Sequence, residues 1–398
     1  RDDLALIRDG GDNLIDASVE TLNIGGATFR ILGLGDISTD EGDYSLTIDA
    51  SAVEGPMGLA GIGSGLAQWR IDGTAPTMIA FYPPMPEQRS TPVSTINVTF
   101  SEPLVEGVFS PEDLTLTRND TLVTIGSPVA IVDLGDANYQ ITGLENFTDD
   151  AGFYALTIDA AGIMDTAGNQ GTGQAVTTWL LDTTTPAPAS NIAISPDTGV
   201  SATDGRTQSS SVLLQGDLSE MGLSVFVFDR TTGADLGEAA IDGLAFTHPI
   251  HFNNAGNHRL RIRVIDPAGN TSEQDYVVFV DITNPLVEQV AIADTVVDSI
   301  LMQFSETVNA ELLVTDQSIL AAVNLVGVET GQVVLEASQF SYDAVARTLE
   351  LVLAEPLLAG TSELHLDGSS FTDQAGNLRR GGQSGIVVFD FQAFATPE

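Results

Sequence analysis

Apolar and polar residues alternate along most of this chain in short runs, which is the pattern of half-buried β-strands. Ile96, Val98 and Phe100, for example, are separated by Asn97 and Thr99. Comparable apolar runs in the same region lie at residues 76–82, 114–116, 129–132, 139–141, 154–158 and 176–181. No segment keeps an apolar period of about 3.6 residues for more than about two turns. The pattern predicts an all-β fold with about seven short strands in each sandwich.

A short motif, Asp-x-Thr-x-Pro, occurs three times, each time directly after an apolar run. Its first residues are Asp72, Asp182 and Asp281, which stand 110 and 99 positions apart. That spacing is the size of one small immunoglobulin-like β-sandwich. The sequence therefore predicts tandem immunoglobulin-like domains arranged end to end. We refer to them as modules one to four, at residues 1–72, 73–182, 183–281 and 282–398.

Modules one and three depart from the pattern of the other two. Residues 3–9 and 42–50 of module one match residues 113–119 and 152–160 of module two. Module one therefore lacks the first two strands of the fold, and an opened sandwich exposes strand edges and core. We expect module one to be partly disordered alone or completed by a strand from another chain, unless proteolysis or an arbitrary cut removed its start. Module three is a different subtype that lacks a Phe-Ser-Glu strand end.

The net charge of the chain limits the classes of partner that it is expected to bind. The formal net charge is −41, all 14 basic residues are Arg, and Cys is absent. Such a chain repels nucleic acid and anionic membranes, and it has neither disulfides nor thiolate zinc sites. Two interpretations of the acidity remain open: a hydrated surface that stays soluble in salty water, and binding of divalent cations, Ca²⁺ above all. No stretch approaches the roughly 18 apolar residues of a membrane-spanning segment.

The most specific recurring loop is Asp-x-Ala-Gly-Asn, which precedes the last strand of modules two, three and four. An ordinary turn explains it, because Asp caps the turn and Gly supplies a positive φ. Alternatively, the Asp and Asn side chains supply oxygen ligands to Ca²⁺. The candidate ligands are Asp165, Asn169, Asp266, Asn270, Asp373 and Asn377. Module one has residues 54–58 (Glu-Gly-Pro-Met-Gly) at this place, so we expect a site there to be absent or weak.

Five further carboxylates are candidate ligands at the module junctions. Asp72, Asp182 and Asp281 stand where the last strand leaves a module, so each either caps the next turn or shares a cation with a neighbouring loop. Glu102 and Glu306 both follow Phe-Ser at the end of a strand, where they are either solvated or further ligands. An ion that bridges two modules would stiffen a hinge that otherwise allows relative motion.

Two other patterns have structural explanations. Tyr44, Tyr154 and, by position, His258 follow a glycine turn, as in the tyrosine corner of sandwich domains. Arg259, Arg261 and Arg263 share one face of a strand, where they either pair with acidic residues of the next strand or bind an anionic partner. The sequence has no catalytic constellation: the histidines are poorly spaced for a metal, and neither a nucleophile elbow nor a phosphate-binding loop is present. We therefore expect no enzyme activity.

Several motifs together resemble a known domain type. They are residues 98–103 (Val-Thr-Phe-Ser-Glu-Pro), 154–158, 162–169, 304–306 and 373–377, while residues 264–270 of module three resemble a neighbouring Ig-like subtype. The combination resembles the bacterial Ig-like (Big-type) repeat domains of large extracellular surface and adhesin proteins. The resemblance covers nearly the whole chain and implies a secreted or cell-surface location, with Ca²⁺ near domain junctions. It specifies a domain type and leaves the task open.

Three hypotheses of function follow. The first is a non-catalytic structural or adhesive stalk of Ca²⁺-supported modules, which projects from a bacterial surface or secreted protein. The second is a subunit of an extracellular filament or surface layer assembled by strand complementation. The third is an accessory sugar-binding or spacer region of a secreted hydrolase. The partners would be further repeats, other copies of the chain or a host or surface ligand, without nucleic acid.

Overall fold

The computed structural model describes residues 2–55, 57–292, 297–327, 331–333, 335, 338–357 and 360–391. Within them the fold is all-β, as predicted, with a few short helices. The chain divides into two compact units, Arg1–Thr183 and Thr184–Glu398, and each is described by itself. Modules one and two fall in the first unit, and modules three and four fall in the second.

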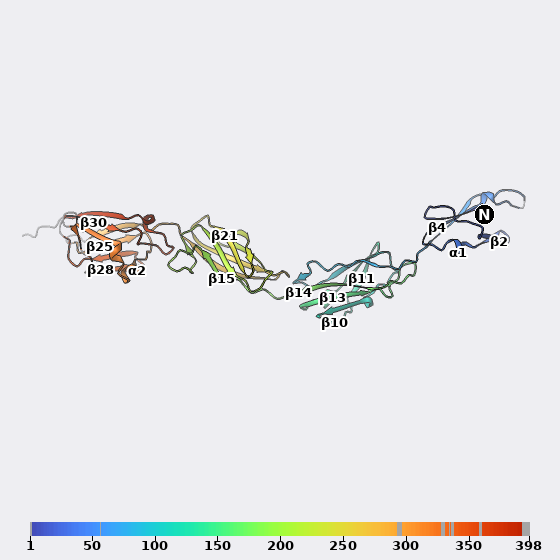
Figure 1. The fold of residues 1–398 in the computed structure, drawn as a ribbon, viewed down its shortest axis with the longest axis horizontal. Coiled ribbons are helices and arrows are strands. Elements are labelled where there is room, and N and C mark those ends of the chain that lie inside the picture. Colours follow the sequence, from blue (N-terminus) through green and yellow to red (C-terminus); the bar gives the residue numbers. More distant parts are fainter. Residues whose placement is uncertain are drawn as a thin grey trace, which may run out of the picture. The chain divides into compact units, whose positions relative to one another are not determined.

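Module two shows the complete sandwich. Its strands are β6 (Met78–Ala80), β7 (Gln88–Arg89), β8 (Thr95–Phe100), β9 (Leu114–Arg118), β10 (Thr121–Val123), β11 (Ala130–Gly135), β12 (Asn138–Thr142), β13 (Gly152–Asp159) and β14 (Gln174–Leu181). One sheet has the order β10-β9-β13-β14-β7 and the other β11-β12-β8-β6. Figure 1 shows β11 in one layer and β10, β13 and β14 in the other. These orders are the CFG and ABED sheets of an immunoglobulin fold, so the predicted tandem immunoglobulin-like sandwich is confirmed here.

Module one repeats the second part of that topology. Its elements are β1 (Leu4–Arg8), β2 (Glu20–Gly25), β3 (Thr28–Leu32), α1 (Leu34–Ile37), β4 (Gly42–Asp49) and β5 (Ser64–Ile71). The sheets are β1-β4-β5 and β2-β3. Leu6 pairs with Leu46 as Leu116 pairs with Leu156 in module two, so the register repeats at the same offset. The described part of module one has no counterparts of β6, β7 and β8, in agreement with the predicted loss of the first strands.

Module three has the same two sheets in a chain of different sequence. Its strands are β15 (Ser190–Ser195), β16 (Arg206–Thr207), β17 (Ser211–Asp217), β18 (Ser224–Asp229), β19 (Ala234–Glu238), β20 (Ala240–Asp242), β21 (Ala245–His251), β22 (Gly256–Ile265) and β23 (Thr271–Val280). Their orders are β15-β17-β21-β20 and β16-β23-β22-β18-β19. The Arg stripe lies on β22 and pairs across to β23: Arg259 contacts Asp275 at 2.6 Å, and Arg261 and Arg263 contact Glu273 at 2.6 and 2.9 Å. The predicted cross-strand pairing is therefore confirmed.

Module four has the same order of strands with two added helical turns. Its elements are β24 (Val287–Ile292), β25 (Ser299–Phe304), α2 (Ala310–Thr315), α3 (Ile319–Ala322), β26 (Val323–Gly327), β27 (Gly331–Gln332), β28 (Gln339–Asp343), β29 (Thr348–Val352), β30 (Gly360–Leu366) and β31 (Gly385–Phe391). The sheets are β24-β25-β29-β28 and β27-β26-β30-β31. Both helices are shorter than about two turns, so they are too short for an apolar period to reveal them.

The aromatic corners recur with the same geometry. The hydroxyl groups of Tyr44 and Tyr154 donate to the carbonyl groups of Asp40 and Asp150, at 2.8 and 2.7 Å. His258 contacts the carbonyl of Asn254 through Nε2 at 2.9 Å. Each partner stands four residues before the ring, so the corner holds the turn that enters the strand. The predicted structural role of these three residues is confirmed. No helix in the described ranges is both long and apolar enough to cross a bilayer.

Candidate metal centre

The Asp-x-Ala-Gly-Asn turn is built around one buried carboxylate. In module two, Asp165 is 1% exposed, and its Oδ1 accepts from the backbone N–H groups of Ala167 and Asn169 at 2.8 and 2.9 Å. Gly168 has φ +94°, which any other residue would adopt only with strain. The turn of module four repeats these bonds around Asp373, which is 2% exposed. The predicted turn is therefore present in both modules.

The asparagine of this turn links it to the preceding module. Asn169 donates from Nδ2 to Oδ2 of Asp165 at 2.8 Å and to the carbonyl oxygen of Asp72 at 2.9 Å. Asn377 donates in the same way to Asp373 and to the carbonyl oxygen of Asp281, at 2.8 and 2.7 Å. Both partners of each amide are acceptors, which fixes its orientation. In this structure the asparagines therefore hold the junction in place, and ligation by their oxygens stays a prediction.

In module one, the same turn forms without the Asp and Asn side chains. Gly55 occupies the place of Asp165, and Leu59 occupies the place of Asn169. The backbone bonds are nevertheless kept, because the N–H of Gly55 donates to Leu59 O and that of Gly58 donates to Gly55 O, both at 2.9 Å. The turn therefore forms without a carboxylate, and turn formation alone does not account for Asp165 and Asn169. The structure thereby corrects the predicted alignment by one residue, because Gly55 and not Glu54 stands at the position of Asp165. A site that is absent or weak in module one stays a prediction.

The junction aspartates cap the first turn of the following segment. Oδ1 of Asp72 accepts from the N–H of Thr74 at 3.2 Å, and Oδ1 of Asp281 accepts from the N–H and hydroxyl of Thr283 at 3.0 and 2.7 Å. The capping role predicted for these two residues is confirmed. The caps also fix where each carboxylate points, and this is toward the next module.

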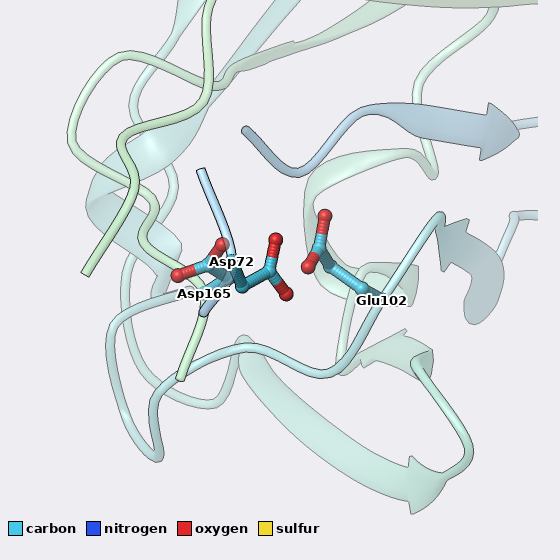
Figure 2. Close-up of side chains that lie close together, drawn as sticks. All are labelled: Asp72, Glu102 and Asp165. Atoms are coloured by element: carbon cyan, nitrogen blue, oxygen red, sulfur yellow. The ribbon is translucent and has the colours of Figure 1, made fainter. Parts of the chain in front are cut away.

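Three carboxylates converge at each of two junctions. Ligand atoms of Asp72, Glu102 and Asp165 all lie within 4.8 Å of one another. Figure 2 shows the carboxylate of Glu102 facing the side chains of Asp72 and Asp165. The second group, with the same spacing, consists of Asp281, Glu306 and Asp373. Each group takes one Asp from the end of a module and two acidic residues from the module that follows.

Burial and neighbouring charges make the glutamate of each group harder to ionise. Burial, followed by the charges of Asp281 and Asp373, raises the pKa of Glu306 to about 7, although Arg347 opposes the shift. Burial and the charges of Asp72 and Asp165 likewise raise the pKa of Glu102. Asp165 behaves in the opposite way: burial acts to raise its pKa, but hydrogen bonds from Asn169 and from the turn outweigh this and lower it. The first group therefore combines a carboxylate whose anionic form is stabilised, Asp165, with a glutamate that is costly to ionise, Glu102.

The donor set fits a hard divalent cation. Oxygens that share one Ca²⁺ at about 2.4 Å are at most about 4.8 Å apart. The ligand atoms of each group lie within this limit. Three carboxylates so close repel one another by on the order of 3 kcal/mol per pair at an effective dielectric constant of about 20. A Ca²⁺ ion would remove this repulsion and leave coordination positions for backbone oxygens or water. Within the described ranges, these are the two carboxylate groups compact enough to share an ion.

The predicted junction between modules two and three has different residues from the two junctions described above. Oδ1 and Oδ2 of Asp266 accept from the N–H and the side-chain amide of Asn270, at 2.8 and 2.9 Å, so the turn itself is present. Module three lacks the Phe-Ser-Glu motif and offers no glutamate of this type. Asp182 belongs to the other unit. A cation site formed by Asp182, Asp266 and Asn270 stays a prediction.

The structure adds contacts that the sequence did not indicate. Glu41 accepts from the N–H of Gly73 and the hydroxyl of Thr74, both at 3.0 Å, and so buttresses the segment that carries Asp72. In module three, the hydroxyl of Thr198 donates to the carbonyl of Ala375 in module four at 2.6 Å. Glu41 does not belong to a repeated motif, because module two has Ala151 at the same place, and Thr198 lies outside the motifs identified in the sequence. No sequence signal therefore distinguishes them.

Comparisons with known proteins do not define a family for this chain. No protein-family model matches the chain, and no curated protein sequence matches it. Among solved structures, an I-band fragment of titin is 10% identical over 81% of this chain and 99% of its own, with a TM-score of 0.37. Fibronectin(III)-like modules of CbhA from Clostridium thermocellum are 15% identical over 52% of this chain and 94% of their own, with a TM-score of 0.29. Because these TM-scores are low, the immunoglobulin-like fold is assigned from the chain's own strand order.

Proposed function

We propose that the chain is part of a non-catalytic extracellular stalk from a bacterial surface or secreted protein, in which Ca²⁺ ions hold successive immunoglobulin-like modules together. The observation that carries this proposal is the recurrence of one carboxylate group at two junctions. Asp72, Glu102 and Asp165 in the first unit correspond one by one to Asp281, Glu306 and Asp373 in the second. The Big-type resemblance of the sequence motifs supports the extracellular and bacterial assignment.

The mechanism is a reduction of hinge motion. Asp72 follows directly on β5, the last strand of module one, whereas Glu102 and Asp165 belong to loops of module two. An ion bound by all three would connect the end of one module to two separate loops of the next. The amide of Asn169 already bonds the backbone of Asp72, so the ion would complete a partly formed joint. The stalk would therefore be stiff in Ca²⁺ and hinged without it.

Removal of calcium should destabilise the modules that carry these groups. At a Ca²⁺ concentration tenfold above the Kd, each site should add about 1.4 kcal/mol to the free energy of unfolding, because the ion binds only the folded state. The measurement is thermal unfolding in Ca²⁺ and in chelator, together with elemental analysis of the metal bound to the purified chain. We expect about two Ca²⁺ ions per chain from the two carboxylate groups.

Substitutions separate a specific site from general screening of an acidic surface. Replacement of both glutamates, Glu102→Gln and Glu306→Gln, should abolish the Ca²⁺-dependent shift. Glu145→Gln removes an exposed carboxylate of module two outside the group and should leave the shift unchanged. The proposed Ca²⁺ link between modules would be refuted if all variants responded equally to Ca²⁺ and to Mg²⁺. It would also be refuted if the purified chain contained no bound metal.

A second candidate function is a subunit of an extracellular filament or surface layer. Accessory sugar binding has less support, since Trp179 is 1% exposed and Trp69 is half-buried against Tyr44. Trp179 therefore presents no free face on which a sugar ring would stack, and Tyr44 covers one face of Trp69.

A further inference from the structure

In module four, the turn between β28 and β29 is bonded to the end of β25, which Glu306 follows at a distance of two residues. The N–H of Phe304 donates to the carbonyl oxygen of Arg347 at 2.9 Å. The hydroxyl group of Thr307 donates to the carbonyl oxygen of Ala344 at 3.3 Å. These two bonds attach the turn to the chain on both sides of Glu306.

Arg347 adds a positive charge beside the acidic group of module four (Asp281, Glu306 and Asp373). Its Nη1 donates to the carbonyl oxygen of Ser305, the residue directly before Glu306. Burial and the charges of the two aspartates raise the pKa of Glu306, whereas the charge of Arg347 acts in the opposite direction. A guanidinium does not lose its proton in proteins. The turn therefore holds a permanent cation close to these three carboxylates.

Module two has the same turn without this charge. Ala137 stands at the place of Arg347, and its carbonyl oxygen accepts from the N–H of Phe100 at 3.0 Å, in the same register as in module four. Both residues have a positive φ, +62° at Ala137 and +58° at Arg347, so the two backbones have the same conformation. The charged side chain is therefore a difference between two otherwise equivalent turns.

We propose that Arg347 is a built-in counter-cation, which lowers the affinity of the acidic group of module four for Ca²⁺ and partly replaces the ion when none is bound. Arg347 acts on the calcium site proposed above, so its role rests on that function. A fixed unit charge repels a divalent ion and, in the absence of the ion, attracts the carboxylates. Arg347 thereby sets the Ca²⁺ concentration at which the joint between modules three and four becomes stiff.

The first test measures the affinity of one acidic group at a time in the whole chain. Glu102→Gln disables the group of module two, and calorimetric titration with Ca²⁺ then gives the Kd of the group of module four. Adding Arg347→Ala should tighten this Kd about tenfold, because a repulsive charge is removed. Arg347→Lys keeps the charge and should leave the Kd within about twofold. The effect of Arg347→Ala should shrink in about 0.5 M salt, which screens the repulsion.

The reciprocal exchange transfers the charge to module two. In a chain with Glu306→Gln, the change Ala137→Arg should weaken Ca²⁺ binding by the group of module two about tenfold. The backbone at this position already has the conformation of Arg347. Circular dichroism in chelator serves as the control for the fold, because Ala137 is buried. The test with Arg347→Ala and Arg347→Lys does not depend on this variant.

Stability separates a counter-cation from a purely structural arginine. In chelator, Arg347→Ala should accelerate hydrogen exchange in β28 and β29, because the carboxylates lose the charge that attracts them. In excess Ca²⁺ the difference from the wild type should vanish or reverse, since tighter binding adds stability. An arginine that acted only through its bond to Ser305 would instead lower the stability equally in both conditions and leave the Kd unchanged.

Two results would overturn this role of Arg347 while Ca²⁺ still binds. One is an unchanged Kd after Arg347→Ala, and the other is an equal shift after Arg347→Ala and Arg347→Lys, which would assign the effect to geometry and not to charge. Absence of Ca²⁺ binding in both the Glu102→Gln and the Glu306→Gln chain would refute the calcium joint itself, and the role of Arg347 with it. The two failures are therefore distinguishable.

Discussion

Replacement of Trp179 with alanine is expected to lower the free energy of unfolding of module two by about 3–5 kcal/mol. Trp179 is 1% exposed and stacks on Tyr154 at a centroid distance of 5.3 Å. Both rings lie in the core between the two complete sheets, so the substitution leaves a cavity that rigid neighbours cannot fill. The same change in module one, Trp69→Ala, should cost less than half as much. Trp69 forms the equivalent stack with Tyr44 at 5.6 Å, but it is only half-buried in an open sandwich.

Hydrogen exchange measured peptide by peptide in the intact chain distinguishes the two modules. Trp179→Ala should accelerate exchange in β13 and β14, and Trp69→Ala should accelerate it to a smaller extent in β4 and β5. The modules carry the same aromatic pair on the same strands, so each serves as the control for the other. An equal cost in both modules would show that the interior of module one is closed in solution, in contradiction to the exposed Phe29 and Ile48.

The fold was predictable because its signals are local and repeated. Six residues are enough to indicate a strand when apolar and polar positions alternate, as they do at Ile96, Val98 and Phe100. The repeated Asp-x-Thr-x-Pro motif indicates where one sandwich ends and the next begins. The absence of the first strands from module one was predicted by aligning its sequence with that of module two. The structure agrees with this alignment, since the registers of β1–β4 and β9–β13 are the same. Each of these inferences needs only short sequence patterns and their repetition along the chain.

The candidate site was only partly predictable, because its geometry depends on contacts between distant residues. Asp72, Glu102 and Asp165 were each identified from a motif, but their convergence depends on three loops that meet only in the folded unit. The amide of Asn169 bonds a backbone oxygen 97 residues away, and no motif encodes that partner. Burial also gives residues of the same type different pKa values. It raises the pKa of Glu306 to about 7, and the amino-acid composition does not reveal this shift.

The stability of module four without calcium is expected to decrease as the pH rises from about 4.5 to about 7. Glu306 has a pKa raised from 4.5 to about 7, so in this window the folded state binds a proton that the unfolded state has released. The stabilisation is complete below the unfolded pKa and is lost as the pH passes the folded pKa. After allowance for partial solvent exposure, the change should be on the order of 2 kcal/mol. Chemical denaturation in chelator measures this change in stability, and hydrogen exchange in β25 and β29 assigns it to module four.

Glu306→Gln isolates this effect, because glutamine resembles the protonated acid and cannot ionise. In chelator at pH 7.5 the variant should be more stable than the wild type, and its stability should no longer decrease across the window. In Ca²⁺ the order should reverse at pH 7.5, since the ion binds the carboxylate and relieves its repulsion from Asp281 and Asp373. Glu102→Gln in module two is the matched variant, and its effect should have the same sign. A Glu306→Gln protein less stable than the wild type in chelator at pH 7.5 would contradict the role of this carboxylate as a repelled member of its group.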